Sequence, residues 1–202
     1  DRTFYENRGV NVKRFLLAIV SMGRFGGGST TTQQLAKNAF LTQEQTVTRK
    51  AKEFFLSLEL TKKYSKQEIL TMYLNNAYFG NGVWGVEDAS QKYFGTSAAN
   101  LTVDEAATLA GMLKGPEIYN PIDNIKNATN RRNTVLANMV DDKKLSQADA
   151  DSAAGVDMAS RLDDTYQGTG DDYKYPSYFD AVIEEATKTY GLSVDKNDKN
   201  VA

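Results

Sequence analysis

The 202-residue sequence contains no cysteine and no histidine, only three prolines, and no long run of apolar residues. The absence of cysteine excludes disulfides and thiolate metal sites, which fits a bacterial exported protein. Without histidine the most common general base is missing, so acid–base chemistry must be carried by carboxylates. The longest apolar candidate, residues 15–20, is far shorter than the roughly 20 residues that a membrane span needs. The formal net charge of −2 gives no electrostatic reason to expect a nucleic-acid partner.

What the sequence does contain is repeated helical periodicity with N-cap signals, up to about residue 160. These signals predict helices over residues 12–22, 30–40, 46–64, 65–74, 102–113, 128–140 and 147–159. Two of the helices open with capping boxes, which begin at Ser65 and Thr102. No strand pattern of comparable length is present, so the sequence predicts a mostly α fold.

The composition changes after about residue 160. Aspartates and glycines dominate residues 163–172, and an amphipathic helix pattern begins at Tyr175. We therefore predict one domain over residues 1–160. Residues 161–202 are predicted to form an acidic linker and the start of a connection to a further domain.

The most informative segment is a glycine run that ends in a Ser/Thr cluster, residues 26–38. It predicts a helix N-terminus followed by one polar stripe, formed by Thr30, Gln34, Lys37 and Asn38. Helix N-terminal N–H groups together with a lysine favour an anionic ligand such as phosphate. The alternative is a flexible surface loop before an ordinary amphipathic helix, and the glycines alone do not separate the two.

This segment, Gly-Gly-Ser-Thr-x-Thr-Gln-Gln-Leu-x-Lys-Asn, resembles the second signature of the family 51 glycosyltransferases. These are peptidoglycan polymerases, found alone or as the N-terminal half of class A penicillin-binding proteins. Four other signatures are matched in the expected order, at residues 1–9, 49–53, 73–85 and 131–136. The resemblance implies a lysozyme-like α fold with a membrane-facing loop around residues 24–28.

Arg49 and Glu53 stand four residues apart and share a helix face. On spacing alone they predict a solvated ion pair. The resemblance implies instead that Arg49 contacts a lipid-linked pyrophosphate and that Glu53 is the second essential carboxylate. Glu53 would orient the cations or help to hold a divalent ion, Mg²⁺ or Mn²⁺, and no organic cofactor is expected.

The first signature departs from the family pattern in two ways. Asn7 stands where histidine is usual, and the leading glutamate, the general base that the resemblance implies, would lie immediately before Asp1. The fragment itself is therefore expected to lack its general base. The candidate substrate-binding residues that the resemblance implies are Asp1, Ser29, Thr30, Gln34, Lys37, Asn38 and Arg49.

The fourth signature predicts a helix end followed by a turn built on Gly80, Gly82 and Gly85, which buries the single tryptophan, Trp84. The fifth, Arg131–Leu136, is explained at least as well by helix packing and surface charge as by substrate contact.

The resemblance implies polymerisation of lipid II into glycan strands, with inversion at C1 of the donor MurNAc and release of undecaprenyl pyrophosphate. It also implies a location at the extracellular face of the cell membrane, through a transmembrane helix upstream of this chain, and a C-terminal transpeptidase domain. The partners would be lipid II, the growing glycan strand and the membrane surface. Two alternatives remain open: an inactive lipid II-binding scaffold, and a lysozyme-like enzyme that cleaves glycan. A glutamate encoded just before Asp1 would favour the polymerase, and a non-acidic residue would favour the scaffold.

Overall fold

The structure, a computed structural model, describes residues 3–11, 29–40, 47–163 and 165. Within these residues the regular elements are helices, and β-type pairing is confined to one isolated bridge, which confirms the mostly α prediction. The chain divides into two compact units, residues 1–76 with 175–202, and residues 77–174. The predicted helices over 12–22 and from Tyr175 onward, the loop at 24–28 and Asp1 lie outside the described residues.

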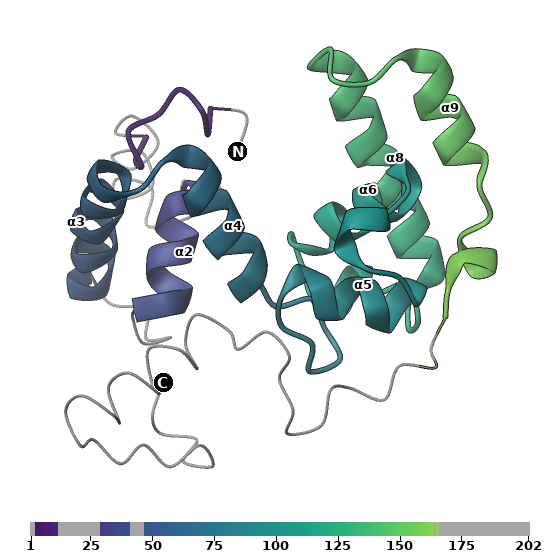
Figure 1. Cartoon of the computed structure of the whole chain (residues 1–202), viewed down its shortest axis with the longest axis horizontal. Helices are drawn as coiled ribbons and strands as arrows, with labels where there is room; N and C mark the ends of the chain where they lie inside the picture. Colours follow the sequence, from purple (N-terminus) through teal and green to yellow (C-terminus); the bar gives the residue numbers. More distant parts are fainter. Residues whose placement is uncertain (1–2, 12–28, 41–46, 164, 166–202) are drawn as a thin grey trace. The chain divides into compact units, whose positions relative to one another are not determined.

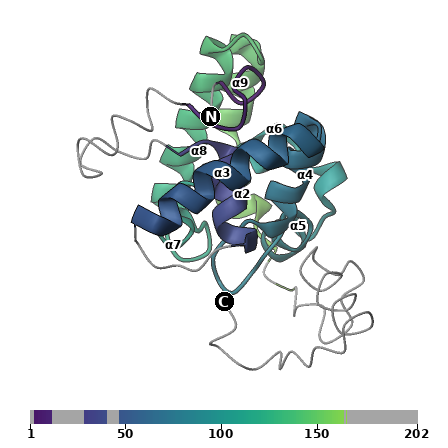
Figure 2. The ribbon, with the colours of Figure 1, turned by 90° about the vertical axis from the view of Figure 1, so that its left-hand side faces the viewer.

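The first unit contains three described helices, α2 (Thr31–Phe40), α3 (Val47–Lys63) and α4 (Lys66–Asn76). Helix α2 packs against both α3 and α4 (Figure 1), and α3 crosses in front of α2 in the view of Figure 2. Buried apolar side chains from these helices and from the segment 3–11 form one core: Phe4, Leu35, Ala36, Ala39, Leu60 and Ile69. This core fixes α2 and α3 side by side, and the candidate site lies on these two helices.

The N-cap signals of the first unit are formed as predicted. Thr30 precedes α2, and its Oγ1 accepts the Gln33 N–H at 3.1 Å. At α4, Ser65 Oγ accepts the Glu68 N–H at 3.2 Å, and the Glu68 carboxylate accepts the Ser65 N–H at 2.8 Å. The bond from the Ser65 N–H, and a second one that the Ser65 hydroxyl donates to the same carboxylate at 2.8 Å, lower the pKa of Glu68. Each bond spans three residues, which is why a sequence pattern can predict it.

The second unit begins with α5 (Val86–Phe94), η1 (Ala98–Asn100) and α6 (Val103–Met112). It continues with α7 (Pro116–Tyr119), α8 (Ile125–Asp141), α9 (Gln147–Gly155) and η2 (Met158–Arg161). Helix α8 packs against α6 and α9 (Figure 1). Two apolar clusters fill this unit, one around Phe79, Tyr93 and Met112 and one around Leu136.

In the second unit, two α-helices were not predicted and one predicted helix is too long. Helix α5 was not predicted, because it is short and lies between Gly85 and Gly95, although it buries Ala89, Ser90, Tyr93 and Phe94. The four-residue α7 was also missed. The helix predicted over 147–159 ends at Gly155, and a separate 3-10 turn follows, in which the Asp157 side chain accepts the Ala159 N–H.

The prediction that Trp84 is buried is wrong, since its side chain is 53% exposed. Tyr78 and Trp84 face each other across the isolated antiparallel bridge, with ring centroids 4.9 Å apart. Neighbouring residues of an extended backbone point to opposite sides, so burial of Phe79 directs Tyr78 and its partner outward. The glycine part of the prediction is confirmed, because Gly80, Gly82 and Gly85 all have positive φ.

Arg132, in the fifth signature, lies inside the second unit with 1% exposure. Its guanidinium donates to the carbonyl oxygens of Ala154 at 2.7 Å and Val156 at 2.8 Å, at the end of α9. Burial lowers the pKa of this arginine, while the charges of Asp104 and Asp157 act in the opposite direction. Helix packing therefore accounts for Arg132.

We expect Arg132→Lys to destabilise the second unit by about 2 kcal/mol, because lysine lacks the planar fork through which Nη1 and Nη2 donate to the two carbonyls. Denaturant unfolding followed by circular dichroism measures the change. Arg131→Lys is the matched control, since Arg131 is half-buried and its Nε–H makes a longer bond, 3.3 Å, to the Gly111 carbonyl. Equal losses from the two substitutions would contradict this account of Arg132.

Candidate active site

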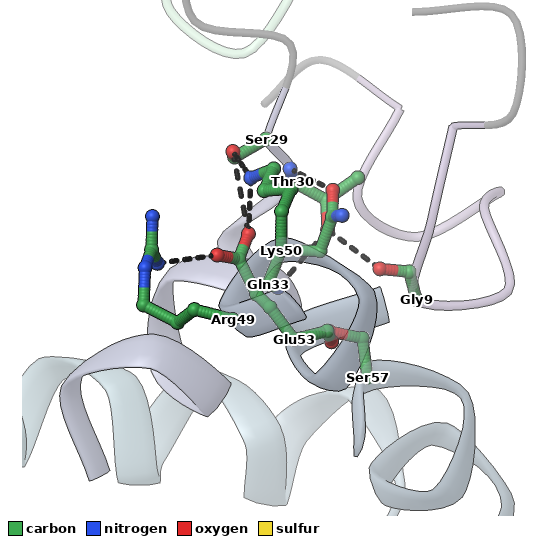
Figure 3. A network of polar contacts seen from close by, with 8 residues as sticks. All are labelled: Gly9, Ser29, Thr30, Gln33, Arg49, Lys50, Glu53 and Ser57. Atoms are coloured by element: carbon green, nitrogen blue, oxygen red, sulfur yellow. Dashed lines mark hydrogen bonds and ion pairs between the residues drawn. The ribbon is translucent and has the colours of Figure 1, made fainter. Parts of the chain in front are cut away.

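The centre of the candidate site is the carboxylate of Glu53 on α3, whose residue exposure is only 1%. Arg49 Nη1 contacts Glu53 Oε2 at 3.0 Å, and Lys50 Nζ forms an ion pair with Oε1. Residues three and four positions apart lie on one face of a helix, so a single turn of α3 places both cations against one anion (Figure 3). Two positive charges beside one buried negative charge leave this cluster with a net charge of +1.

Ser29 joins this cluster to the beginning of α2. Its hydroxyl accepts a hydrogen bond from Lys50 Nζ at 2.6 Å and contacts Glu53 Oε1 at 3.5 Å (Figure 3). Ser29 and Arg49 are thus the described substrate-binding candidates that lie directly at the Glu53 carboxylate. The cluster brings together residues that are 21 to 24 positions apart in the sequence.

Thr30, which was assigned to the polar stripe of α2, is buried at the helix N-terminus. Its Oγ1 donates to the Gly9 carbonyl at 2.6 Å and accepts the Gln33 N–H, while Gln33 Oε1 accepts the Thr30 N–H at 2.9 Å. The hydroxyl of Thr30 therefore holds two backbone segments together. Gln33 Nε2 and Thr32 Oγ1 are also buried here, and neither finds a hydrogen-bond partner within the described part of the chain.

Gln34, Lys37 and Asn38 follow along α2, and their side chains are half-buried. Tyr73 on α4 donates its hydroxyl to Gln34 Oε1 at 3.0 Å, and burial raises the pKa of Tyr73. No hydrogen bond or ion pair among the described residues engages the side chains of Lys37 and Asn38. Gln34 is thus held in place by α4, whereas Lys37 and Asn38 have polar ends that a ligand could use.

Sequence reasoning overlooked Lys50 and the role of Gly9. Lys50 lies inside the third signature, and its spacing of three from Glu53 is a detectable signal for a shared helix face. The bond between Thr30 and the Gly9 carbonyl gave no sequence signal, because it joins segments 21 residues apart.

The donor set around Glu53 does not fit a resident divalent ion. Mg²⁺ and Ca²⁺ sites are built from several oxygen ligands, whereas both Glu53 oxygens here face cationic nitrogens of Arg49 and Lys50. The described residues also contain no group of three or more His, Cys, Asp or Glu side chains that could hold a metal ion. We therefore assign no step to a metal.

Within the described residues, no helix has the length and apolar character that crossing a membrane requires. The segments that were predicted to face or enter the membrane lie outside these residues.

Comparison with known proteins gives consistent results. The model of the transglycosylase family matches residues 1–140. Penicillin-binding protein 2a of Streptococcus pneumoniae is 65% identical over 196 residues, which cover 97% of this chain and 27% of that protein. Penicillin-binding protein 1F of Bacillus subtilis is 40% identical over 197 residues, with 96% and 27% coverage. A crystal structure of penicillin-binding protein 1A from Haemophilus influenzae has 30% identity, 79% and 20% coverage, and a TM-score of 0.46. The chain spans about a quarter of the length of the curated relatives it matches.

Proposed function

Because the chain belongs to the transglycosylase family, as the glycosyltransferase domain of a class A penicillin-binding protein, we propose that it polymerises lipid II into glycan strands. In the proposed reaction the 4-hydroxyl of an acceptor GlcNAc attacks C1 of a donor MurNAc. The new C1–O bond forms on the face opposite the pyrophosphate, so the anomeric centre is inverted. Undecaprenyl pyrophosphate leaves with the electron pair of the broken bond.

The observation that carries this proposal is the cationic environment of Glu53. A pyrophosphate leaving group needs stabilisation of its developing charge more than it needs a proton. Arg49 and Lys50 lie on one turn of α3, and α2 presents its positive N-terminal end close to them through Ser29. Lys37 adds a further cation on α2. A neutral glycan chain has no anionic group for such a site, which argues against the glycan-cleaving alternative.

We assign the residue roles as follows. A glutamate expected immediately before Asp1 takes the proton from the acceptor hydroxyl, and Glu53 orients Arg49 and Lys50 toward the pyrophosphate. The remaining proposed substrate contacts come from the N-terminal segment and α2: Asp1, Ser29, Thr30, Gln34, Lys37 and Asn38. Thr30 would act through its backbone and the helix N-terminus, since its hydroxyl is already bonded to Gly9.

The setting of the reaction is part of the proposal. We place the domain, as residues 1–160 with a lysozyme-like helical arrangement, at the extracellular face of the cell membrane, anchored by an upstream transmembrane helix. Residues 161–202 would lead into a C-terminal transpeptidase domain. The relatives are about four times as long as this chain, which leaves room for such a domain.

The decisive experiment incubates the full-length protein with fluorescent lipid II and separates the products on a gel. We expect a ladder of glycan strands that appears as lipid II is consumed. Shortening of preformed glycan without consumption of lipid II would favour the cleaving enzyme. Saturable lipid II binding without any product would favour the scaffold.

A further inference from the structure

The side-chain amide of Asn7 forms hydrogen bonds through both of its polar atoms, and these link Thr3, Gly9 and Lys66. Its Nδ2 donates to the Thr3 carbonyl at 2.8 Å. Its Oδ1 accepts the Gly9 N–H at 2.9 Å and also lies 3.3 Å from Lys66 Nζ on α4. These contacts use a donor and an acceptor on one side chain, and a primary amide provides both.

Gly9 connects the segment 3–11, which Asn7 holds in place, to the candidate site. Its carbonyl accepts the Thr30 hydroxyl at 2.6 Å, at the N-cap of α2 (Figure 3). Its Cα is pressed so closely against α3 that a Cβ there would overlap the Ser57 carbonyl oxygen. Gly9 is therefore fixed against α3 one helical turn beyond Glu53 and against the residue that follows Ser29.

From these contacts we infer that Asn7 is a positioning residue for the proposed glycosyl transfer. Its Oδ1 holds the turn at Gly9, and Gly9 in turn holds the N-terminus of α2 beside the Glu53 cluster. The same turn anchors the N-terminal segment, next to which the general base is expected. This inference rests on the proposed function, but it assigns a role that the signature alone does not give, since the family pattern has histidine at this position.

The choice of asparagine has a chemical consequence. A neutral imidazole can accept the Gly9 N–H through Nδ1, but a protonated imidazole cannot, and histidine titrates near pH 6.5. Lys66 from α4 is a charged group that faces Asn7. The groups that meet Gly9 are the Ser57 backbone carbonyl and the Thr61 hydroxyl from α3 and the Thr30 hydroxyl before α2, and none of them titrates in this pH range. An amide keeps the acceptor at every pH, so this turn does not weaken in acid.

Three substitutions in the full-length protein test the inference through kcat and KM for lipid II between pH 5.5 and 8. Asn7→Leu removes the acceptor and is expected to lower kcat about tenfold with KM changed less than about twofold. Asn7→Asp keeps the acceptor and adds attraction to Lys66, so its kcat should stay within about threefold of wild type. Asn7→His should approach wild type at pH 8. Its rate relative to wild type should then fall about tenfold as the pH drops below about 6.5, where the imidazole is protonated.

Leu136→Ala is the control for loss of stability, because it opens a cavity in the core of the second unit and touches none of these contacts. It should lower the melting temperature while the kcat at 25 °C stays at the wild-type value. The inference is overturned if Asn7→Leu polymerises like wild type, if Asn7→Asp is as slow as Asn7→Leu, or if the Asn7→His ratio does not depend on pH. A wild-type protein that makes no glycan would instead overturn the proposed function.

Discussion

Glu53→Gln is expected to lower the rate of lipid II polymerisation by about 10³-fold, the scale of losing a preorganised charged group from an active site. Glutamine has nearly the shape of glutamate, so the side chain still fits its buried position. It no longer carries the negative charge that fixes Arg49 Nη1 at 3.0 Å and Lys50 Nζ on the other oxygen. The two cations would then lose their common orientation toward the leaving pyrophosphate.

Glu59→Gln provides the matched control for this prediction. Glu59 lies on the same helix and also pairs with a lysine three positions away, but the side chains of Glu59 and Lys62 are 61% and 70% exposed. Exposed pairs contribute less than about 1 kcal/mol, so this variant should polymerise at the wild-type rate. Gel assays of both variants with fluorescent lipid II make the comparison. Near-normal ladders from Glu53→Gln would show that polymerisation does not need the Glu53 carboxylate.

The parts of the fold that could be predicted are those governed by local chemistry. The caps at Thr30 and Ser65 are made by bonds across three residues, so the sequence contains all the partners. The exposure of Trp84 depends on its pairing with Tyr78 across a glycine turn. Glycine and tryptophan content alone cannot tell which side of that pairing meets solvent.

The same distinction separates the predicted and the missed parts of the site. The Arg49–Glu53 pair follows from a spacing of four on a helix, and its burial could not be read from that spacing. The contact of Ser29 with Lys50 and the contact of Thr30 with Gly9 depend on how α2 packs on α3. The sequence pattern predicts that Thr30 lies on a stripe that faces a ligand. In the folded protein its hydroxyl instead bonds to the backbone of Gly9 and Gln33.

Gly9→Ala is expected to destabilise the first unit by about 4 kcal/mol. Gly9 has φ of 87°, a region that costs an L-residue about 1–2 kcal/mol. In addition, the new methyl group would overlap Thr61 Oγ1 and the Ser57 carbonyl oxygen, and the Ser57 carbonyl carbon would lie 3.1 Å away. A helix backbone cannot move aside cheaply, so the overlap must be relieved by displacing the segment 3–11.

Gly82→Ala separates the conformational cost of a positive φ from the cost of steric overlap. Gly82 has φ of 75°, but a Cβ built there meets nothing within 4 Å. This control therefore carries only the conformational cost and should lose about 1–2 kcal/mol. Differential scanning calorimetry of the two variants and wild type gives both values. We expect Gly9→Ala to lose about 2 kcal/mol or more beyond the loss in Gly82→Ala, and this difference reports how tightly the segment 3–11 packs on α3. Equal losses would mean that the segment moves away from α3 at no cost in stability.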